Sequence, residues 1–347
     1  MSPLAVWRFA QAYRARAGYP HRHLPQHDPS DLGLAFEAVR IPSGGVDLAG
    51  WWIPQPDGVS APAVLLVHGW ESARDRTLPN AQLLHALGLH VLTIDIRGHG
   101  ENSAEEMPVT AGEFGEDALA AVRWLLDRAD VTSVGVLGHS MGGIGALLAA
   151  AAEPRVGAVV SASTPADPYR LTRQTFRLAR LPLPGPLAYP LAWLATHVML
   201  QPRGHTVRSI SATRAIETYR GPILLLHGDA DTVVPFSHLG RLAARALRSR
   251  QGDPEAGSVE VLALPGAPHS WLYEIPAYRA AVARFLTEHL GGRVRPDEAA
   301  AIGAALRLHR PEPRSHVPGG FAAIRDEPGG FRTIWRAVRE GGGVARP

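Results

Sequence analysis

The sequence lacks two residue types altogether. Its 347 residues include no cysteine and no lysine, so its 35 permanently basic side chains are all arginine. Without a lysine amine, Schiff-base catalysis by a side chain and the lysine-bearing phosphate loop of nucleotide-binding enzymes are excluded. Without a thiol, a cysteine nucleophile, a disulfide framework and a thiolate zinc site are excluded as well. A covalent catalyst in this chain would have to use Ser, Thr, Asp, Glu, His or Tyr.

Long hydrophobic runs are also missing. No apolar run approaches the roughly 20 residues that a bilayer-spanning helix needs. Arg8, Arg14 and Arg16 interrupt the apolar residues of the N-terminus, where a signal peptide would need an unbroken core. The chain is 46% hydrophobic and 19% charged, which is enough apolar surface for a core and too little charge for a disordered chain. We therefore expect a globular, cytoplasmic protein.

The charges are unevenly distributed, although the net charge is only +3. Residues 1–30 carry four Arg and one acid, residues 31–290 carry 21 Arg and 25 acids, and residues 291–347 carry ten Arg and six acids. We therefore predict a basic N-terminal arm (1–30), a mildly acidic body (31–290) and a C-terminal extension (291–347). The balance of charges argues against nucleic-acid binding. For the arm, packing on the body is favoured over contact with a membrane surface.

The body alternates short apolar runs with longer helical ones, and this pattern predicts a doubly wound α/β fold with about eight strands, most of them parallel. The later runs are continuously apolar, as expected for strands that are buried on both faces of a sheet. The expected strands are 35–41, 48–53, 63–67, 90–94, 133–137, 156–161, 222–227 and 258–264. The expected helices are 74–87, 112–129, 142–153, 235–249 and 271–290. The first two strands should form an antiparallel hairpin at one edge.

One interval, residues 162–208, contains no strand but is rich in proline and aromatic residues. A segment of this length between sheet elements is usually functional, and we predict a helical lid over the active site. Four arginines in it would lie on one face of a helix: Arg170, Arg173, Arg177 and Arg180. A solvated helix face is favoured for them over the steering of an anionic substrate.

The most informative motif is Gly138-His-Ser140-Met-Gly142, which follows an expected strand and precedes an Ala-rich helix. A serine on a strained strand-to-helix turn needs glycine neighbours that leave it room, and the helix N-terminus then lies beneath the developing negative charge. The pentapeptide alone is weak, but its place between a strand and a helix is specific. Ser140 is therefore the expected nucleophile.

Four other segments fall at the ends of expected strands. They are His68-Gly69-Trp70, Asp95-Ile-Arg97-Gly98-His99-Gly100, Gly228-Asp229-Ala-Asp231-Thr-Val-Val234-Pro235 and Pro265-Gly-Ala-Pro-His269. With the serine motif, these segments resemble, in the same order, those of the α/β-hydrolase superfamily, in particular its lid-bearing serine esterase and lysophospholipase-like branch. The likeness covers about residues 34–290 and makes 31–290 the expected hydrolase domain.

This resemblance implies a role for each motif. Ser140 would be the nucleophile, His269 the general base and Asp231 the acid that orients it. The backbone N–H groups of Trp70 and Met141 would form the oxyanion hole. The residues that bind the rest of the substrate stay unknown, and the implied chemistry requires no metal and no cofactor.

Other residues compete for these roles. Asp229 and Asp167 are alternatives to Asp231, and His227 and His289 are alternatives to His269. We expect His68, His99 and His139 to hold loops in place rather than to transfer protons.

The leading interpretation is a serine hydrolase that cleaves a small-molecule carboxylic ester. A thioesterase, a peptidase and an acyltransferase with the same three residues are alternatives. A hydrolase-like module that binds a ligand without turnover is an alternative of a different class.

Overall fold

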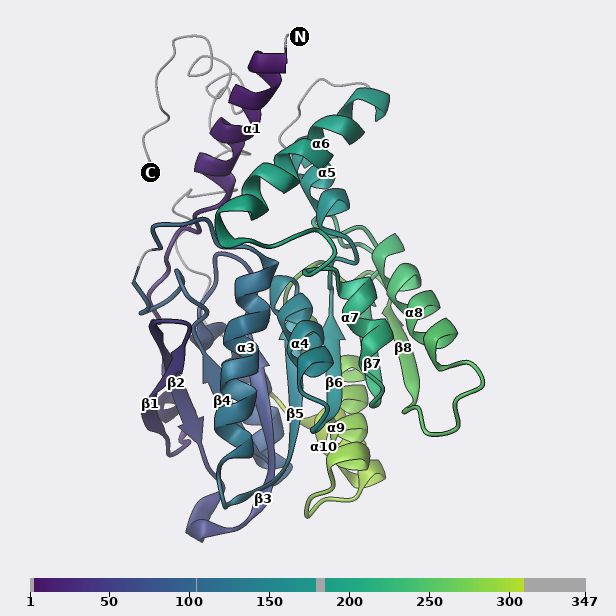
Figure 1. The fold of residues 1–347 in the computed structure, drawn as a ribbon. Helices are drawn as coiled ribbons and strands as arrows, with labels where there is room; N and C mark the ends of the chain where they lie inside the picture. The colour runs from purple at the N-terminus through teal and green to yellow at the C-terminus, as the bar shows by residue number, and fades with distance from the viewer. Residues whose placement is uncertain (1–2, 104, 179–184, 309–347) are drawn as a thin grey trace.

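The computed structural model describes residues 3–103, 105–178 and 185–308, and its centre is one sheet of eight strands (Figure 1). The order of the strands is β1-β2-β4-β3-β5-β6-β7-β8. Their bounds are β1 Glu37–Ser43, β2 Val46–Ile53, β3 Ala61–Val67, β4 His90–Ile94, β5 Val131–His139, β6 Val156–Ala162, β7 Ile223–Gly228 and β8 Val259–Leu264. Each overlaps a strand expected from the sequence, so the predicted fold class is confirmed.

The sheet is antiparallel at one edge and parallel elsewhere. β1 and β2 form a hairpin in which Glu37 lies opposite Trp52, and β2 continues antiparallel to β4. The other six strands, β3 to β8, run parallel to one another. Their carboxyl ends therefore lie along a single edge of the sheet, where ligands bind in α/β folds of this kind.

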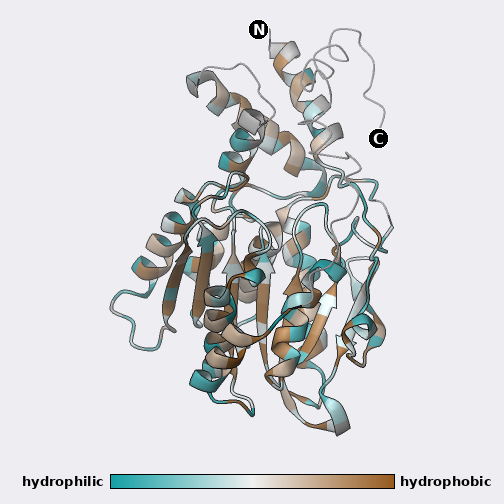
Figure 2. Ribbon diagram, turned by 180° about the vertical axis from the view of Figure 1, so that it is seen from behind, coloured by the Kyte–Doolittle hydropathy of each residue, from teal (hydrophilic) through white to brown (hydrophobic). Residues whose placement is uncertain are grey.

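Helices cover both faces of the sheet because successive residues of its central strands point to opposite sides. In β3, Leu65 packs into a core with α3, α4, α7 and α8, whereas Leu66 packs into a second core with α2, α9 and α10. Both leucines are fully buried, and Figure 2 shows the central strands as the most hydrophobic part of the molecule. The helices are α2 Leu78–Ala86, α3 Ala111–Leu126, α4 Met141–Ala152, α7 Ala212–Thr218, α8 Ser237–Arg250, α9 Pro276–Leu290 and α10 Pro296–Ala305.

Three further helices stand above the carboxyl edge of the sheet (Figure 1). α5 Pro168–Leu178 and α6 Gly185–Leu200 belong to the interval 162–208. α1 Pro3–Ala17 lies in the predicted basic arm and packs against α6, where Arg14 donates a hydrogen bond to the carbonyl of Val198 at 3.4 Å. We call α1, α5 and α6 the upper helices. The sequence patterns did not predict α1 or α7 as helices.

The chain that follows α9 turns back onto it. Gly303 of α10 lies against the backbone of Arg279, and the Arg279 guanidinium donates hydrogen bonds to the carbonyls of Gly303 and Ala304 at 2.7 and 2.9 Å. The rest of the predicted extension, from residue 309 to residue 347, lies outside the described residues. Within the described part of the chain, no helix has the length and apolar character needed to cross a bilayer.

Candidate active site

Ser140 occupies a sharp turn between β5 and α4. Its backbone is at φ 56° and ψ −121°, a conformation that residues other than glycine rarely adopt. The turn is possible because the residues two positions before and two positions after Ser140 are glycines, whose backbones lie too close to neighbouring backbone for a side chain to fit. A Cβ on Gly138 would lie 2.1 Å from the carbonyl oxygen of Gly142, and one on Gly142 would lie 2.3 Å from that of Val67. The sequence prediction of a strained strand-to-helix turn at Ser140 is therefore confirmed.

Ser140, His269 and Asp231 are joined in series by hydrogen bonds. His269 Nδ1 lies 2.7 Å from Asp231 Oδ2, and His269 Nε2 lies 3.1 Å from Ser140 Oγ. Because a carboxylate only accepts, Nδ1 carries the proton and Nε2 is left to accept the proton of the serine hydroxyl. The structure thus brings together three residues that lie up to 129 positions apart in the sequence.

The Asp231 carboxylate accepts four hydrogen bonds in a buried setting. Oδ1 accepts from the backbone N–H groups of Val233 and Val234, both at 2.8 Å. Oδ2 lies 3.2 Å from His227 Nε2 as well as 2.7 Å from His269 Nδ1. Burial alone would raise the pKa of Asp231, but the hydrogen bonds from His227 and His269 outweigh burial and hold the pKa well below its usual range. The carboxylate is therefore ionised at neutral pH.

His227 contacts the acid rather than the nucleophile. Its Nε2 lies 2.9 Å from the carbonyl of Val234, an obligate acceptor, so this nitrogen is protonated and shares its proton with Asp231 Oδ2. The sequence analysis weighed His227 only as a base and missed this role. The available signal was a histidine at the end of a buried strand, four residues before the acid.

His139 supports the other side of His269. Its Nε2–H donates to the backbone carbonyl of His269 at 2.7 Å, and the two rings are 4.9 Å apart. Burial, together with the neighbouring His269, lowers the pKa of His139 to about 4. His139 directly precedes Ser140, so the neutral His139 ring links the loop that carries His269 to the turn that carries the serine.

The competing residues lie elsewhere. Asp229 is exposed and accepts a hydrogen bond from the N–H of Gly266 at 2.7 Å. Asp167 pairs with Arg170 at 3.1 Å, and His289 contacts Ser258 at 3.3 Å. None of these three makes the contact with Ser140 or His269 that would fit it for the role.

The two predicted oxyanion donors flank the serine. Trp70 follows β3 in the loop His68-Gly69-Trp70, and Met141 is the first residue of α4. His68 fixes this loop, because its Nε2 accepts from the N–H of Ile96 at 3.1 Å and its Nδ1 donates to the carbonyl of Gly69 at 2.7 Å. Trp70, Ser140, Met141 and His269 all line one cavity.

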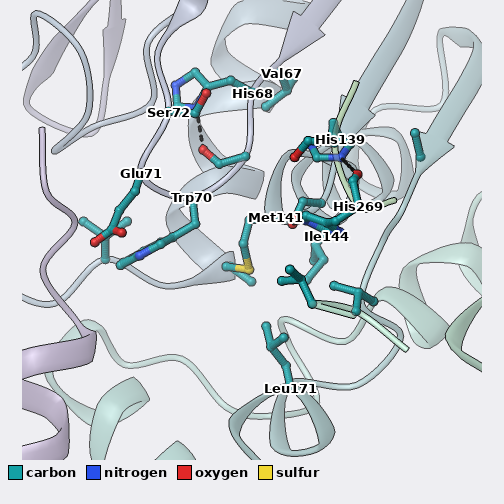
Figure 3. Close-up of a pocket in the computed structure, with 18 of the residues that line it drawn as sticks. Val67, His68, Trp70, Glu71, Ser72, His139, Met141, Ile144, Leu171 and His269 are labelled. Atoms are coloured by element: carbon teal, nitrogen blue, oxygen red, sulfur yellow. Dashed lines mark hydrogen bonds between the residues drawn. The ribbon is translucent and has the colours of Figure 1, made fainter. Parts of the chain in front are cut away.

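This cavity has a volume of about 470 Å³ and lies between the carboxyl edge of the sheet and the upper helices. Figure 3 shows Met141 and Ile144 between the His139–His269 pair and Leu171, which projects from α5, with Trp70 to the left of Met141. Its apolar wall includes side chains from all three upper helices: Ala17 of α1, Leu171 of α5, and Met199 and Leu200 of α6. The contribution of α1 was missed, because no motif links an N-terminal helix to the site.

The far side of the cavity is more polar. Arg76, Thr77 and Asn80 line it, and the Arg76 guanidinium lies 4.3 Å from the ring centroid of Trp271. Clusters of possible metal ligands in the described chain are Glu113–Glu116–His205 and Glu260–Glu288–His289, and neither lines the cavity. In the first cluster, Glu113 is already bonded to His205 at 2.7 Å and lies 3.6 Å from Arg203.

The arginines predicted for the interval 162–208 do not act as one group. Arg170 pairs with Asp167, and Arg173 lies over the ring of Tyr189 at 3.9 Å. The side chain of Arg177 and the whole of Arg180 lie outside the described residues.

Comparisons with known proteins agree with the fold and the motifs. Residues 62–182 match the family model described as the alpha/beta hydrolase fold. The fold and the matched motifs are those of the α/β-hydrolase superfamily, and the chain is similar to esterases and lipases of that superfamily. These relatives support a hydrolase as the general class of this protein.

Three relatives indicate the extent of the likeness. The uncharacterized protein Rv2307c of Mycobacterium tuberculosis is 29% identical over 263 residues, which are 75% of this chain and 82% of that protein. The lysophosphatidylserine lipase ABHD12 of Danio rerio is 26% identical, over 68% of this chain and 60% of the lipase. An esterase of Pyrococcus furiosus superposes with a TM-score of 0.61 at 24% identity, over 79% of this chain and 97% of the esterase. This chain spans less than two thirds of the Danio lipase.

Proposed function

We propose that this protein is a serine hydrolase that cleaves carboxylic esters through an acyl-enzyme on Ser140. The observation that carries the proposal is the hydrogen-bonded series Asp231–His269–Ser140, with distances of 2.7 and 3.1 Å, at the wall of a cavity of about 470 Å³. The strained turn supports it further, because such strain is kept where a side chain must be presented to a ligand.

In the first half of the reaction, Ser140 Oγ attacks the carbonyl carbon of the ester while its proton passes to His269 Nε2. The imidazolium that forms is stabilised by the ionised Asp231, which also holds the proton-bearing Nδ1 in place. The tetrahedral intermediate then collapses, the ester C–O bond breaks, and His269 returns its proton to the departing alcohol.

The negative charge on the tetrahedral oxygen needs donors that are already oriented. The N–H groups of Trp70 and Met141 would supply them, with the N-terminus of α4 adding a favourable dipole. Loss of one such donor costs about 10²–10³-fold in kcat in other serine hydrolases.

In the second half, a water molecule takes the position of the alcohol. His269 accepts a proton from the water, the hydroxide attacks the acyl carbon, and the acid product leaves as Ser140 regains its proton. The only co-reactant is water.

The apolar wall formed by Leu171, Met199 and Leu200 favours an ester with a hydrophobic acyl group. α5 and α6 would then act as the lid over this group. The names of the lysophosphatidylserine lipase relatives support an ester in preference to a thioester or an amide.

The proposal is tested with a fluorophosphonate probe and a series of p-nitrophenyl esters. Wild-type protein should be labelled and should hydrolyse the esters, whereas Ser140→Ala should show neither reaction. The matched control Ser258→Ala removes a hydroxyl that lies outside the cavity and should behave as wild type.

Equal labelling of wild type and Ser140→Ala, or no labelling of either, would refute the mechanism and favour a binding module. Faster turnover of matched thioesters or amides would assign the same residues to a thioesterase or a peptidase. Acyl transfer to an added alcohol in preference to water would identify an acyltransferase.

A further inference from the structure

Large apolar side chains are exposed on two of the upper helices. Leu4 and Trp7 of α1 are 57% and 43% exposed, and Tyr189 and Trp193 of α6 are 44% and 56% exposed. Residues three or four positions apart share a helix face, so each helix presents its pair on one side. No other tryptophan in the described residues is exposed to this extent.

The inner ends of the same helices belong to the cavity. Tyr13 and Ala17 line it from α1, and Thr196, Met199 and Leu200 line it from α6. The two helices pack together, and in Figure 1 their N-terminal ends point away from the sheet. Leu4, Trp7 and Tyr189 thus lie toward the ends of these helices that point away from the sheet, Trp193 lies midway along α6, and none of the four lines the cavity.

The charged side chains within the upper helices are all of one sign. α1 and α5 contain three arginines each, α6 contains none, and none of the three helices contains an acidic residue. Arg8 is exposed one position after Trp7. By contrast, the predicted body has more acids than arginines.

We propose that the exposed faces of α1 and α6 that carry these four residues form a docking surface for an anionic phospholipid bilayer. Tryptophan and tyrosine prefer the level of the lipid headgroups, where the ring is buried and its polar atom stays hydrated. Arginines beside them add attraction to anionic lipid, and the absence of acids removes repulsion. A protein partner would not by itself require exposed aromatic side chains together with arginines and no acidic residues on these helices.

Docking in this orientation would place the upper helices, and the cavity that they line, on the side of the molecule that faces the lipid. The surface would therefore give the site access to esters that are dissolved in a membrane. Binding itself does not depend on turnover, so it can be measured on the Ser140→Ala variant.

The test is co-sedimentation of the full chain with vesicles of phosphatidylcholine alone and vesicles that also contain phosphatidylglycerol. Wild type and Ser140→Ala should bind the anionic vesicles and not the neutral ones, and added salt should weaken binding. The pair Trp7→Ser with Trp193→Ser should lower the partition coefficient by at least about tenfold. Arg8→Gln should lower it about fivefold.

Two controls use α8, on the body. Leu247 is 55% exposed and Arg248 is also exposed, so Leu247→Ser and Arg248→Gln make the same kinds of change away from the upper helices. Both should bind vesicles as wild type does. The tryptophan pair variant, Arg8→Gln and the two α8 variants should hydrolyse a soluble ester at the wild-type rate, which establishes that they are folded.

Three outcomes would overturn the proposal. They are a wild type that does not bind anionic vesicles, equal binding by the tryptophan pair variant, and equal loss of binding in the α8 controls. If wild type instead forms a dimer that the tryptophan pair variant dissociates, and neither binds vesicles, the surface joins two copies of this chain.

Discussion

The site at the sheet edge and the upper helices are stabilised in different ways. At the sheet edge, a buried carboxylate accepts four hydrogen bonds, and each ring nitrogen of His269 has a partner. Between the upper helices, the described polar contacts join side chains that do not react, such as the Thr172 and Thr196 hydroxyls at 2.9 Å and Arg173 over the ring of Tyr189 at 3.9 Å. The first region fixes the geometry of reacting atoms, and the second supplies apolar walls that can vary without disturbing it.

The largest effect that separates the two regions should come from Asp231. Asp231→Asn removes the charge that stabilises the imidazolium and allows the wrong tautomer of His269, so kcat should fall about 10⁴-fold. KM for a p-nitrophenyl ester should stay within a few-fold, because the upper helices supply the acyl wall.

Asp229→Asn is the matched control for this change, since Asp229 is two residues away and bonds to Gly266 rather than to His269. Its kcat should remain near that of wild type. A comparable loss of kcat in both variants would mean that the loop, and not the Asp231 charge, is what matters.

A smaller effect is expected at His227, a positioning residue that never contacts substrate. His227→Leu removes one donor to the Asp231 carboxylate, and kcat should fall about tenfold or more with little change in KM. His227→Gln, whose amide nitrogen can donate from a similar place, should recover most of the rate. If both variants lose activity equally, or if KM rises instead of kcat falling, His227 acts only in packing.

The smallest effect concerns the base of the upper helices, where His205 follows α6 and bonds to Glu113 of α3 at 2.7 Å. This hydrogen bond to Glu113 outweighs burial and raises the pKa of His205 above 6.5. Because the folded-state pKa is raised, the contribution to stability is complete below pH 6.5 and is lost as the pH rises through the raised value.

His205→Gln should therefore melt below wild type, by about 2 °C, in mildly acidic buffer and approach it in alkaline buffer. Thermal melts followed by circular dichroism across this range measure the difference. A deficit that grows with pH would contradict the assignment.

The sheet and the three residues of the site were accessible from the sequence because each depends on local patterns. Continuous apolar runs define the buried strands, and Gly138 and Gly142 are required by backbone contacts at the turn. Asp231 and His269 lie in the loops that follow β7 and β8, so the order of strands places them at one edge.

The remaining features depend on contacts between distant segments. The support of Asp231 by His227 depends on how the loop after β7 folds back onto the strand. The place of α1 depends on packing against α6, and an Arg-interrupted apolar segment does not specify such a partner. Tertiary contacts of this kind leave no periodic signal in the sequence.

The contact between His139 and the carbonyl of His269 has a consequence for motion during turnover. His139 and Ser140 are consecutive, and both bond to His269, one through its backbone and the other through its ring. The loop carrying His269 is thereby held at two points, at the end of β5 and at the turn after it. It cannot move relative to Ser140 without breaking at least one of the two hydrogen bonds. We therefore expect any rearrangement of α5 and α6 during turnover to leave the distance between nucleophile and base unchanged.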